Sequence, residues 1–323
     1  MGLYYLGLKR KTIQNNNYFN KAIVVRGGCK DKGDINYFDL YNCDIDYNIL
    51  SNFSKISEYY ADAVRQISLV DNNAKFVLYN QAAIEYMDDL SNIICVNDIS
   101  LVKKLNNKPI SRELLSDCIN VLEYKYLPGN KISYNVVSNL YNGKFEKYVI
   151  QQPAGFGGIG TFLLTAENSD EIINQLDKSL IYSISGYVES SSVNNTFMIS
   201  DNHIHIFDGS MQLIIPDKEL SYDGWDFDKY KKLTDIQKQN IYNQTLNIVT
   251  KLQLLGYRGI GGVDYIVSGN DVYFMEINPR FQASSEELDK MLVNQGFPSI
   301  FELNYYAFYN QDKFLEIVTK LEK

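Results

Sequence analysis

The stretch FMEINPR, residues 274–280, carries three polar side chains in a segment that otherwise has the composition of a buried strand. Successive side chains of a strand point to opposite faces, so we expect Phe274 and the three polar groups, Glu276, Asn278 and Arg280, on one face. A carboxylate and an amide oxygen suit a hard cation such as Mg²⁺, and a guanidinium suits a phosphate or a carboxylate. The alternative explanation is the solvated face of an amphipathic strand.

A neighbouring segment favours the metal site. Asp264 lies within the apolar strand GVDYIV, and the turn SGND at residues 268–271 returns the chain antiparallel. Pairing outward from this turn places Asp264 near Glu276. Two carboxylates this close repel each other unless a divalent cation lies between them. The hairpin therefore predicts a metal site formed by Asp264, Glu276 and Asn278.

A glycine-rich loop, GFGGIGT at residues 155–161, separates two expected strands in EKYVIQQPAGFGGIGTFLLT. Glycines let a backbone approach an anion closely and point N–H groups at it. The loop has neither the GxxxxGK[ST] pattern nor a GxGxxG that opens a helix, because the apolar, β-branched TFLLT follows it. Both a mobile lid over phosphates and a simple hairpin tip remain open.

Composition limits the class of protein. The chain has 323 residues, of which 45% are hydrophobic, and this length favours more than one domain. A net charge of -8 argues against nucleic acid and membranes as partners, so an anionic substrate needs local positive groups. Neither a signal peptide nor a membrane span is expected. The cysteines show no metal or disulfide spacing, which suggests a cytoplasmic protein: Cys29, Cys43, Cys95 and Cys118.

Hydrophobic periodicity indicates a mixed α/β and α+β chain. We expect strands at KAIVV (21–25) and KFVLYN (75–80), a helix in ISEYYADAVRQI (56–67), and a long helix in TDIQKQNIYNQTLNIVTKLQLLG (234–256). The segment GSMQLIIPDKELSYDGWDF (209–227) is expected to be rich in loops and to line a substrate-binding pocket.

Five segments in this order resemble the ATP-grasp superfamily of carboxylate–amine ligases. They are NNKPISRELL, YVIQQPAGFGGIGTFLL, ISGYVE, GYRGIGGVDYIV and VYFMEINPRFQASS, within about residues 101–290. The resemblance implies the ATP-grasp fold, in which two α+β subdomains clasp ATP after a smaller N-terminal α/β domain. The implied division is an N-terminal domain at 1–100, a small subdomain with the glycine-rich lid at 101–183, and a large subdomain with the metal and substrate site at 184–323.

The resemblance also implies a reaction. A carboxylate of an amino acid or peptide attacks the γ-phosphate of ATP, and an amine captures the resulting acyl phosphate to form an amide or peptide bond. ATP and Mg²⁺ (or Mn²⁺) are the implied cofactors, and a homodimer is a common assembly of such ligases. Three alternatives remain open: a carrier-protein thiol as acceptor, a nucleotide-binding module without turnover, and an enzyme that phosphorylates a small molecule and stops there.

Site residues follow from the matched positions. Asp264, Glu276 and Asn278 match metal ligands, and Arg280 matches the arginine that steadies the transferring phosphoryl group or the acyl phosphate; Arg280 and Asn278 are the implied catalytic residues. Lys108 matches a phosphate-binding lysine, although Lys103 and Lys104 lie close enough to compete. The remaining nucleotide-binding positions are the lid glycines Gly157, Gly158 and Gly160, the adenine hinge Tyr187 and Val188, and Glu189 or Asn194 at the ribose.

One position departs from the family pattern. Many relatives have Lys-Pro before the loop, whereas this chain has Gln152-Pro153, which replaces a charge by an amide donor. The departure implies weaker ATP binding, a charge supplied by Lys108 or elsewhere, or a decayed enzyme. The intact metal residues and Arg280 favour the second explanation. We expect a lysine at position 152 to leave activity intact or to raise the affinity for ATP.

Two other features have ordinary structural explanations beside functional ones. His203 and His205 share a strand face and would need a third ligand to bind a metal. Arg258 could bind a substrate carboxylate or form a surface ion pair.

Overall fold

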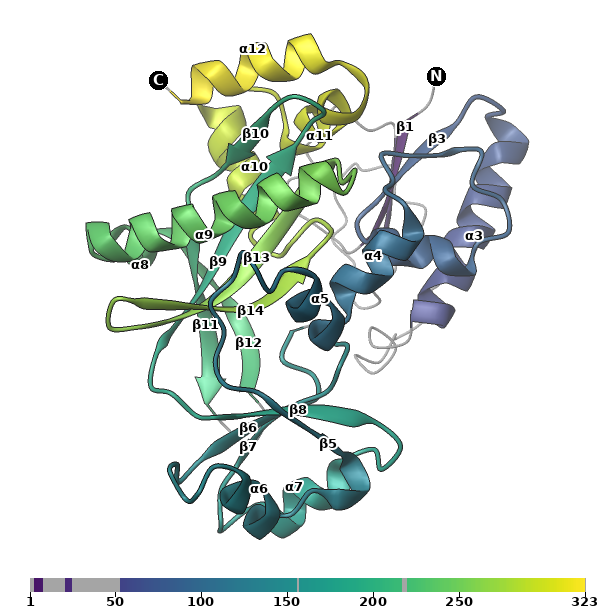
Figure 1. Cartoon of the computed structure of the whole chain (residues 1–323). Coiled ribbons are helices and arrows are strands. Elements are labelled where there is room, and N and C mark those ends of the chain that lie inside the picture. Colours follow the sequence, from purple (N-terminus) through teal and green to yellow (C-terminus); the bar gives the residue numbers. More distant parts are fainter. Residues whose placement is uncertain (1–2, 8–20, 25–52, 156, 217–219, 323) are drawn as a thin grey trace.

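The computed structural model describes residues 3–7, 21–24, 53–155, 157–216 and 220–322, and these residues form three β-sheets with helices packed between and around them (Figure 1). Cys29 and Cys43 lie outside the described residues. No helix in the described part of the chain is long and apolar enough to span a membrane.

The N-terminal sheet is parallel, with the order β2-β1-β3-β4. Its strands are β1 (Leu3–Gly7), β2 (Lys21–Val24), β3 (Lys75–Leu78) and β4 (Ile93–Ile94). One face packs on α3 (Phe53–Val70) and on the 3₁₀ helix η1 (Gln81–Tyr86). The expected strands and helix of this region are confirmed. Parallel strands direct their carboxyl ends to one edge, where loops commonly bind ligands.

The small sheet is antiparallel, with the order β5-β8-β6-β7. It consists of β5 (Lys125–Pro128), β6 (Tyr148–Gln151), β7 (Thr161–Leu164) and β8 (Ile181–Gly186). Tyr148, Ile150 and Ile184 face a core beneath η2 (Gly129–Lys131), α6 (Tyr134–Leu140) and α7 (Ser169–Gln175). The opposite face therefore carries Gln151 and Ser183, which are paired in register. The expected strand, glycine loop and strand are confirmed.

The large sheet supplies most of the candidate site. Its order is β12-β11-β9-β13-β14, and β10 pairs with β9; the bounds are β9 (Ser191–Ile199), β10 (Ile204–Ile206), β11 (Ser210–Pro216), β12 (Leu220–Asp226), β13 (Gly259–Ser268) and β14 (Asp271–Asn278). The expected loop-rich segment is wrong, since β11 and β12 form a hairpin there. The expected long helix is confirmed as α9 (Asp235–Leu254), which begins with a capping box formed by Thr234 and Gln237.

The remaining helices join the sheets. α4 (Ile99–Asn106) and α5 (Lys108–Leu114) contact β14, and α8 (Phe227–Lys231) contacts β11. Three helices end the chain: α10 (Ser285–Asn294), α11 (Ile300–Tyr309) and α12 (Gln311–Leu321). Tyr5, Phe281 and Phe301 share one core, so the N-terminal sheet and the C-terminal helices pack together. The domain boundaries at 100 and 183 stay predictions.

Candidate active site

The hairpin of β13 and β14 holds the two carboxylates in the expected register. Asp264 pairs with Glu276, and Gly262 pairs with Asn278. A bulge follows, because Tyr265 pairs with Phe274 and leaves Met275 as an extra residue. The expectation that Phe274 shares the polar face is therefore wrong. The bulge turns Phe274 into the core with Ile277, whereas Glu276 stays on the opposite face.

The polar side chains on this face contact one another directly. Asn194 Nδ2 donates to Asp264 Oδ1 at 2.6 Å, and Asn278 Nδ2 donates to Asp264 Oδ2 at 3.0 Å. Arg280 Nη2 donates to Asn278 Oδ1 at 2.7 Å. Two residues before Asn278 on β14, Glu276 Oε2 lies 2.9 Å from Lys108 Nζ of α5. Five residues singled out from the sequence thus lie in one cluster. They are the expected metal ligands Asp264, Glu276 and Asn278 and the two cations Arg280 and Lys108.

Burial and neighbouring charges shift the pKa values of the two carboxyl groups in opposite directions. Burial, together with the neighbouring Glu276, raises the pKa of Asp264 to about 7, although hydrogen bonds from Asn194 and Gln212 oppose the rise. Burial also works against ionisation of Glu276, but the ion pair with Lys108, together with the positive charges of Arg280 and Arg112, outweighs it and lowers the pKa of Glu276. Near neutral pH, Glu276 is therefore ionised and Asp264 is poised to lose its proton.

The raised pKa of Asp264 predicts a pH dependence of stability. The folded protein holds this proton up to about pH 7, while the unfolded chain releases it near its ordinary acidic pKa. The stabilising contribution is therefore fully present at acid pH and is lost as the pH rises toward 7. Relative to Asp264→Asn, the metal-free wild type is expected to lose stability between about pH 4 and about pH 7, and to show no further relative loss above that range. Urea unfolding in EDTA measures this, and parallel pH profiles for the two proteins would contradict it.

The same side chains form a donor set that fits a hard divalent cation. In the described part of the chain, no group of three or more His, Cys, Asp or Glu side chains could hold a metal ion. Two carboxylates and an amide, Asp264, Glu276 and Asn278, nevertheless suit Mg²⁺, which commonly binds one or two carboxylates together with substrate phosphates. Asn278 Oδ1 accepts from Arg280, so a metal would share or replace that hydrogen bond.

Lys108 is the lysine that the fold directs into the cluster. Asn107 caps α5 by accepting from Ile110 N at 3.1 Å, and Lys108 N donates to Pro153 O at 2.9 Å. These contacts fix the start of the helix beside the end of β6. Lys103 instead forms an exposed ion pair with Glu85 at 2.7 Å, and Lys104 is exposed. Of the three candidates, only Lys108 is buried against the carboxylates.

Gln152 supports the glycine-rich loop. Its Nε2 donates to Ile159 O at 3.2 Å, and its backbone N donates to Gly160 O at 3.0 Å. Gly160 has a φ of +72°, and a Cβ there would lie 2.1 Å from Gln152 Cδ. At the outer end of the loop, Tyr222 N donates to Gly157 O at 3.3 Å. The expected lid glycines therefore belong to a loop that rests on the Gln152 side chain and on β12.

This contact predicts the behaviour of position 152. Gln152→Leu keeps the bulk but removes the donor to Ile159 O, so we expect the affinity for ATP to fall by roughly fivefold. Gln152→Lys keeps a donor and adds a charge, so it should retain or raise the affinity. Titration with Mg²⁺-ATP measures both. Equal affinities for Gln152→Leu and the wild type would show that the loop does not depend on this side chain.

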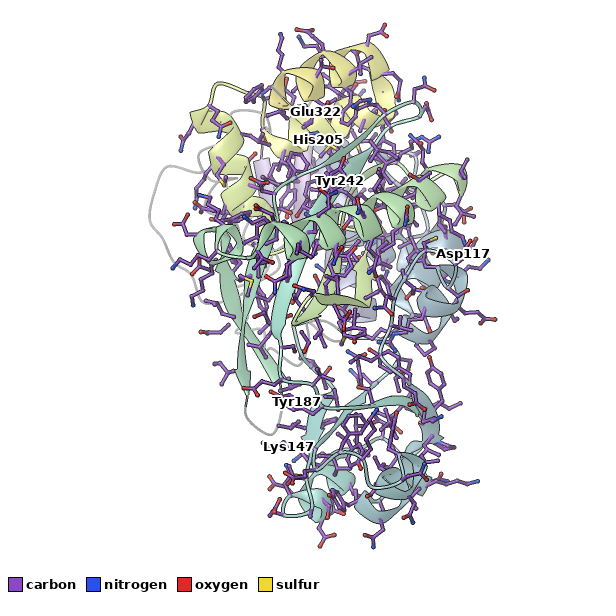
Figure 2. All side chains as sticks on the ribbon, turned by 60° about the vertical axis from the view of Figure 1, so that its left-hand side comes forward. Asp117, Lys147, Tyr187, His205, Tyr242 and Glu322 are labelled. Atoms are coloured by element: carbon purple, nitrogen blue, oxygen red, sulfur yellow. The ribbon has the colours of Figure 1, made fainter. Side chains whose placement is uncertain are left out.

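The expected adenine hinge follows β8. Tyr187 N donates to Lys147 O at 2.9 Å, and Lys147 Nζ lies 5.9 Å from the centroid of the Tyr187 ring (Figure 2). Glu189 is exposed, and its carbonyl accepts from Ser268 Oγ at 3.1 Å. Asn194, the other ribose candidate, is buried beside Asp264 instead. The two ribose candidates thus lie beside different residues of β13, Glu189 beside Ser268 and Asn194 beside Asp264.

Arg112 and Tyr124, which the motifs did not single out, lie beside the cluster. Arg112 is buried on α5 and donates to Met275 O at 3.0 Å, and its guanidinium carbon lies 3.7 Å from the centroid of the Tyr124 ring. Its position four residues after Lys108 is a usable signal, because side chains at that spacing share a helix face.

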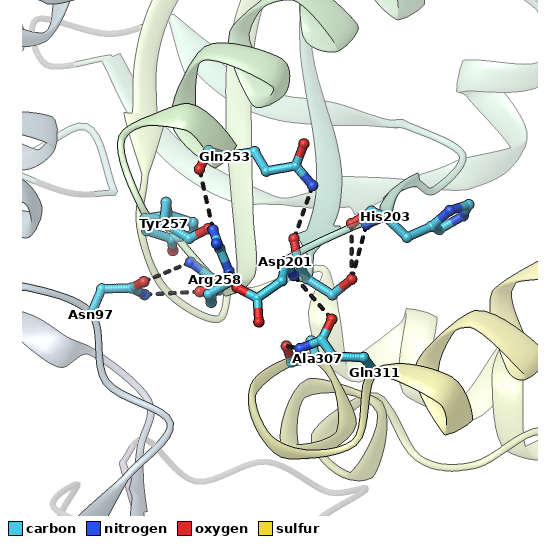
Figure 3. Close-up of polar contacts among 9 residues, drawn as sticks. Asn97, Asp201, His203, Gln253, Tyr257, Arg258, Ala307 and Gln311 are labelled. Carbon is cyan, nitrogen blue, oxygen red and sulfur yellow. Dashed lines mark hydrogen bonds and ion pairs between the residues drawn. The ribbon is translucent and has the colours of Figure 1, made fainter.

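The other candidates lie away from the cluster. Arg258 forms an ion pair with Asp201 and donates to Tyr257 O at 2.7 Å, and its backbone contacts Asn97 (Figure 3). His205 Nδ1 lies 3.4 Å from Glu322 Oε1 near the C-terminal helix (Figure 2). The ion pair favours the structural explanation of Arg258, and among the described residues no group of three or more His, Cys, Asp or Glu side chains around His205 could hold a metal ion.

Comparisons with known proteins match part of this chain to a family. Residues 124–284 match the family described as "ATP-grasp domain". No match was found among curated proteins.

Solved structures share the fold at low identity. They include carboxyaminoimidazole ribonucleotide synthase from Aspergillus clavatus complexed with ATP (TM-score 0.61, 14% identity, 98% of this chain and 77% of that one). They also include N5-carboxyaminoimidazole synthetase from Staphylococcus aureus complexed with ADP (0.56, 14%, 95% and 76%) and L-amino acid ligase from Bacillus licheniformis (0.60, 11%, 95% and 74%).

Proposed function

Because this chain belongs to the ATP-grasp superfamily, whose enzymes are ligases, we propose that it is an ATP-dependent, ADP-forming carboxylate–amine ligase. The proposed substrate is an amino acid or a peptide, whose carboxylate is activated as an acyl phosphate and coupled to an amine. The product is an amide or peptide bond.

The observation that carries this proposal is that two cations and two carboxylates lie in one cluster with Asn278 on the polar face of β13 and β14. Asp264, Glu276 and Asn278 would hold Mg²⁺, which supplies neutralisation of the triphosphate when bound. Arg280 and Lys108 add two cations to the same cluster, within 2.7 Å of Asn278 and 2.9 Å of Glu276, respectively. Phosphoryl transfer needs positioning and charge stabilisation above all, and this set of residues supplies both.

The proposed reaction has two steps. In the first, a carboxylate oxygen of the substrate attacks the γ-phosphorus, the bond to the β–γ bridging oxygen breaks, and ADP leaves. Arg280 stabilises the charge on the transferring phosphoryl group, and the glycine loop over Gln152 excludes water from it. In the second, the amine attacks the acyl carbon, phosphate leaves with the C–O bond electrons, and the amine nitrogen loses a proton.

Trapping of the acyl phosphate tests the proposal. We would incubate the full chain with Mg²⁺-ATP, hydroxylamine and a panel of amino acids and dipeptides, each with and without a second amino acid, and measure ADP and hydroxamate. One carboxylate that yields a hydroxamate would support the ligase and identify the donor. ADP release that depends on the carboxylate, with a stable phosphorylated product and no transfer to any amine, would instead favour a kinase. ATP binding without ADP release across the panel would favour a nucleotide-binding module.

A further inference from the structure

The guanidinium of Arg112 is a buried cation whose hydrogen-bond partners in the described part of the chain are neutral. Nη1 donates to Ser183 Oγ at 3.2 Å, and Nη2 donates to Gln151 Oε1 at 2.9 Å and to Met275 O at 3.0 Å. The side chain of Arg112 is 5% exposed, and its Nε is buried with no hydrogen-bond partner. The Tyr124 ring covers one face of the guanidinium, with 3.7 Å between Cζ and the ring centroid.

Arg112 lies where the small and large sheets meet. Gln151 and Ser183 are paired on β6 and β8 of the small sheet, whereas Met275 is the bulged residue of β14. Figure 1 shows α5, which carries Arg112, beside β14 and above the small sheet. One turn earlier on α5, Lys108 reaches Glu276, the neighbour of Met275. A single helix face therefore presents two cations next to the carboxylate cluster.

This arrangement leaves a local excess of positive charge. Three cations, Lys108, Arg112 and Arg280, accompany the two carboxyl groups of Asp264 and Glu276. Arg112 lies within electrostatic reach of Glu276 but no hydrogen bond joins them, and a desolvated guanidinium with an unpaired N–H is costly. An anion that enters this region would offset that cost. In a chain with a net charge of -8, such a site is a local feature and not a consequence of the overall charge.

Gln152 replaces a lysine that many relatives have, and it does not provide a positive charge in this region. Its amide is directed at the loop, where Nε2 donates to Ile159 O, and it is neutral. Arg112 instead contacts Gln151, the residue before it, through a planar fork of donors that matches a phosphate. Its neutral partners, a serine hydroxyl and a glutamine amide, can be exchanged for phosphate oxygens at little electrostatic cost.

We propose that Arg112 binds the phosphate chain of the nucleotide and supplies the positive charge that Gln152 lacks. This inference rests on the proposed function, because it assumes that a nucleotide binds between the two sheets. The alternative role is a mechanical one, in which Arg112 only joins the sheets through Gln151, Ser183 and Met275.

Equilibrium binding by calorimetry separates the two roles. We would titrate the full chain with Mg²⁺-ATP and with adenosine, comparing the wild type, Arg112→Gln, Arg112→Lys and Lys104→Gln. Lys104→Gln makes the same charge change at an exposed position of α4, the helix that precedes α5. Arg112→Gln is expected to weaken Mg²⁺-ATP binding by roughly tenfold to a hundredfold and to leave adenosine binding unchanged. Arg112→Lys should recover part of the loss, and Lys104→Gln should match the wild type.

The other outcomes overturn the inference. Equal losses for Mg²⁺-ATP and adenosine would assign Arg112 the mechanical role, and unchanged affinity for Mg²⁺-ATP would exclude it from the phosphate site. If Arg112→Gln does not fold, Arg112→Lys decides: a loss confined to Mg²⁺-ATP supports the inference, and an equal loss contradicts it. A wild type that binds neither Mg²⁺-ATP nor adenosine would overturn the proposed function itself. A wild type and an Arg112→Gln variant that bind Mg²⁺-ATP equally well would overturn only the role of Arg112.

Discussion

Replacing Glu276 by alanine or glutamine is expected to abolish ATP turnover, with a fall in kcat for ADP formation of at least roughly 1,000-fold. Glu276 is ionised at neutral pH, it pairs with Asp264 across the hairpin, and it would bind the metal that neutralises the triphosphate. Glutamine keeps the shape of the side chain but loses the charge. Coupled measurement of ADP, together with Mg²⁺ titration, should show that both metal affinity and turnover are lost.

Stability must be measured beside activity, because removing Glu276 leaves Lys108 buried without its counter-charge. Breaking a buried pair in this way costs about 3–5 kcal/mol, so Glu276→Ala is expected to lower the unfolding midpoint more than Glu276→Gln does. Glu316→Gln is a matched control, because Glu316 forms exposed ion pairs with Lys313 and Lys320 on α12. If a folded Glu276→Ala protein kept the wild-type rate of ADP formation, the assignment of the metal site would be wrong.

Replacing Arg280 by lysine should lower kcat by roughly 1,000-fold while the dissociation constant of Mg²⁺-ATP changes little. The two guanidinium nitrogens of Arg280 are used differently: Nη2 donates to Asn278 Oδ1 at 2.7 Å, and Nη1 donates to Phe281 O at 3.1 Å. This fork holds the guanidinium over the cluster. A lysine keeps the charge but cannot make both contacts, so it loses the position that the transferring phosphoryl group requires.

Single-turnover formation of hydroxamate, measured at saturating ATP, isolates this step from product release. Arg65→Lys is the matched control, because Arg65 is on the exposed side of α3 and pairs only with Asp62 among the described residues. An unchanged kcat with a raised KM for the carboxylate would move Arg280 from the phosphoryl group to the binding of the substrate. An unchanged kcat and KM would remove it from the site.

Local patterns in the sequence predicted the parts of the fold that depend on short-range chemistry. The hairpin register follows from the SGND turn and from alternating apolar residues, and it places Asp264 opposite Glu276 as expected. The long helix α9 follows from apolar periodicity and a capping box at Thr234. Both features are confirmed because the residues that specify them are neighbours along the chain.

The two wrong predictions concern residues whose structure depends on contacts between distant parts of the chain. Simple alternation placed Phe274 on the polar face, but the bulge at Met275 turns it into the core. The segment at 209–227 contains glycine, proline and aspartate residues that resemble loop residues, yet pairing of β11 with β9 and β12 makes it part of the large sheet. Cross-strand hydrogen bonds and core packing outweigh local propensity at such positions.

By itself, the sequence determined the residue types of the candidate site, their order and the register of one hairpin, because alternation and turn chemistry act over a few residues. Only the tertiary structure decided that Lys108 pairs with Glu276, that Gln152 faces the loop, and that Arg112 lies between the two sheets. The contacts of Lys108 and Arg112 join α5 to β14, which are far apart along the chain. The contact of Gln152 joins the two ends of the glycine-rich loop. The partners in these contacts are set by how helices and sheets pack, and no local pattern of residues encodes that packing.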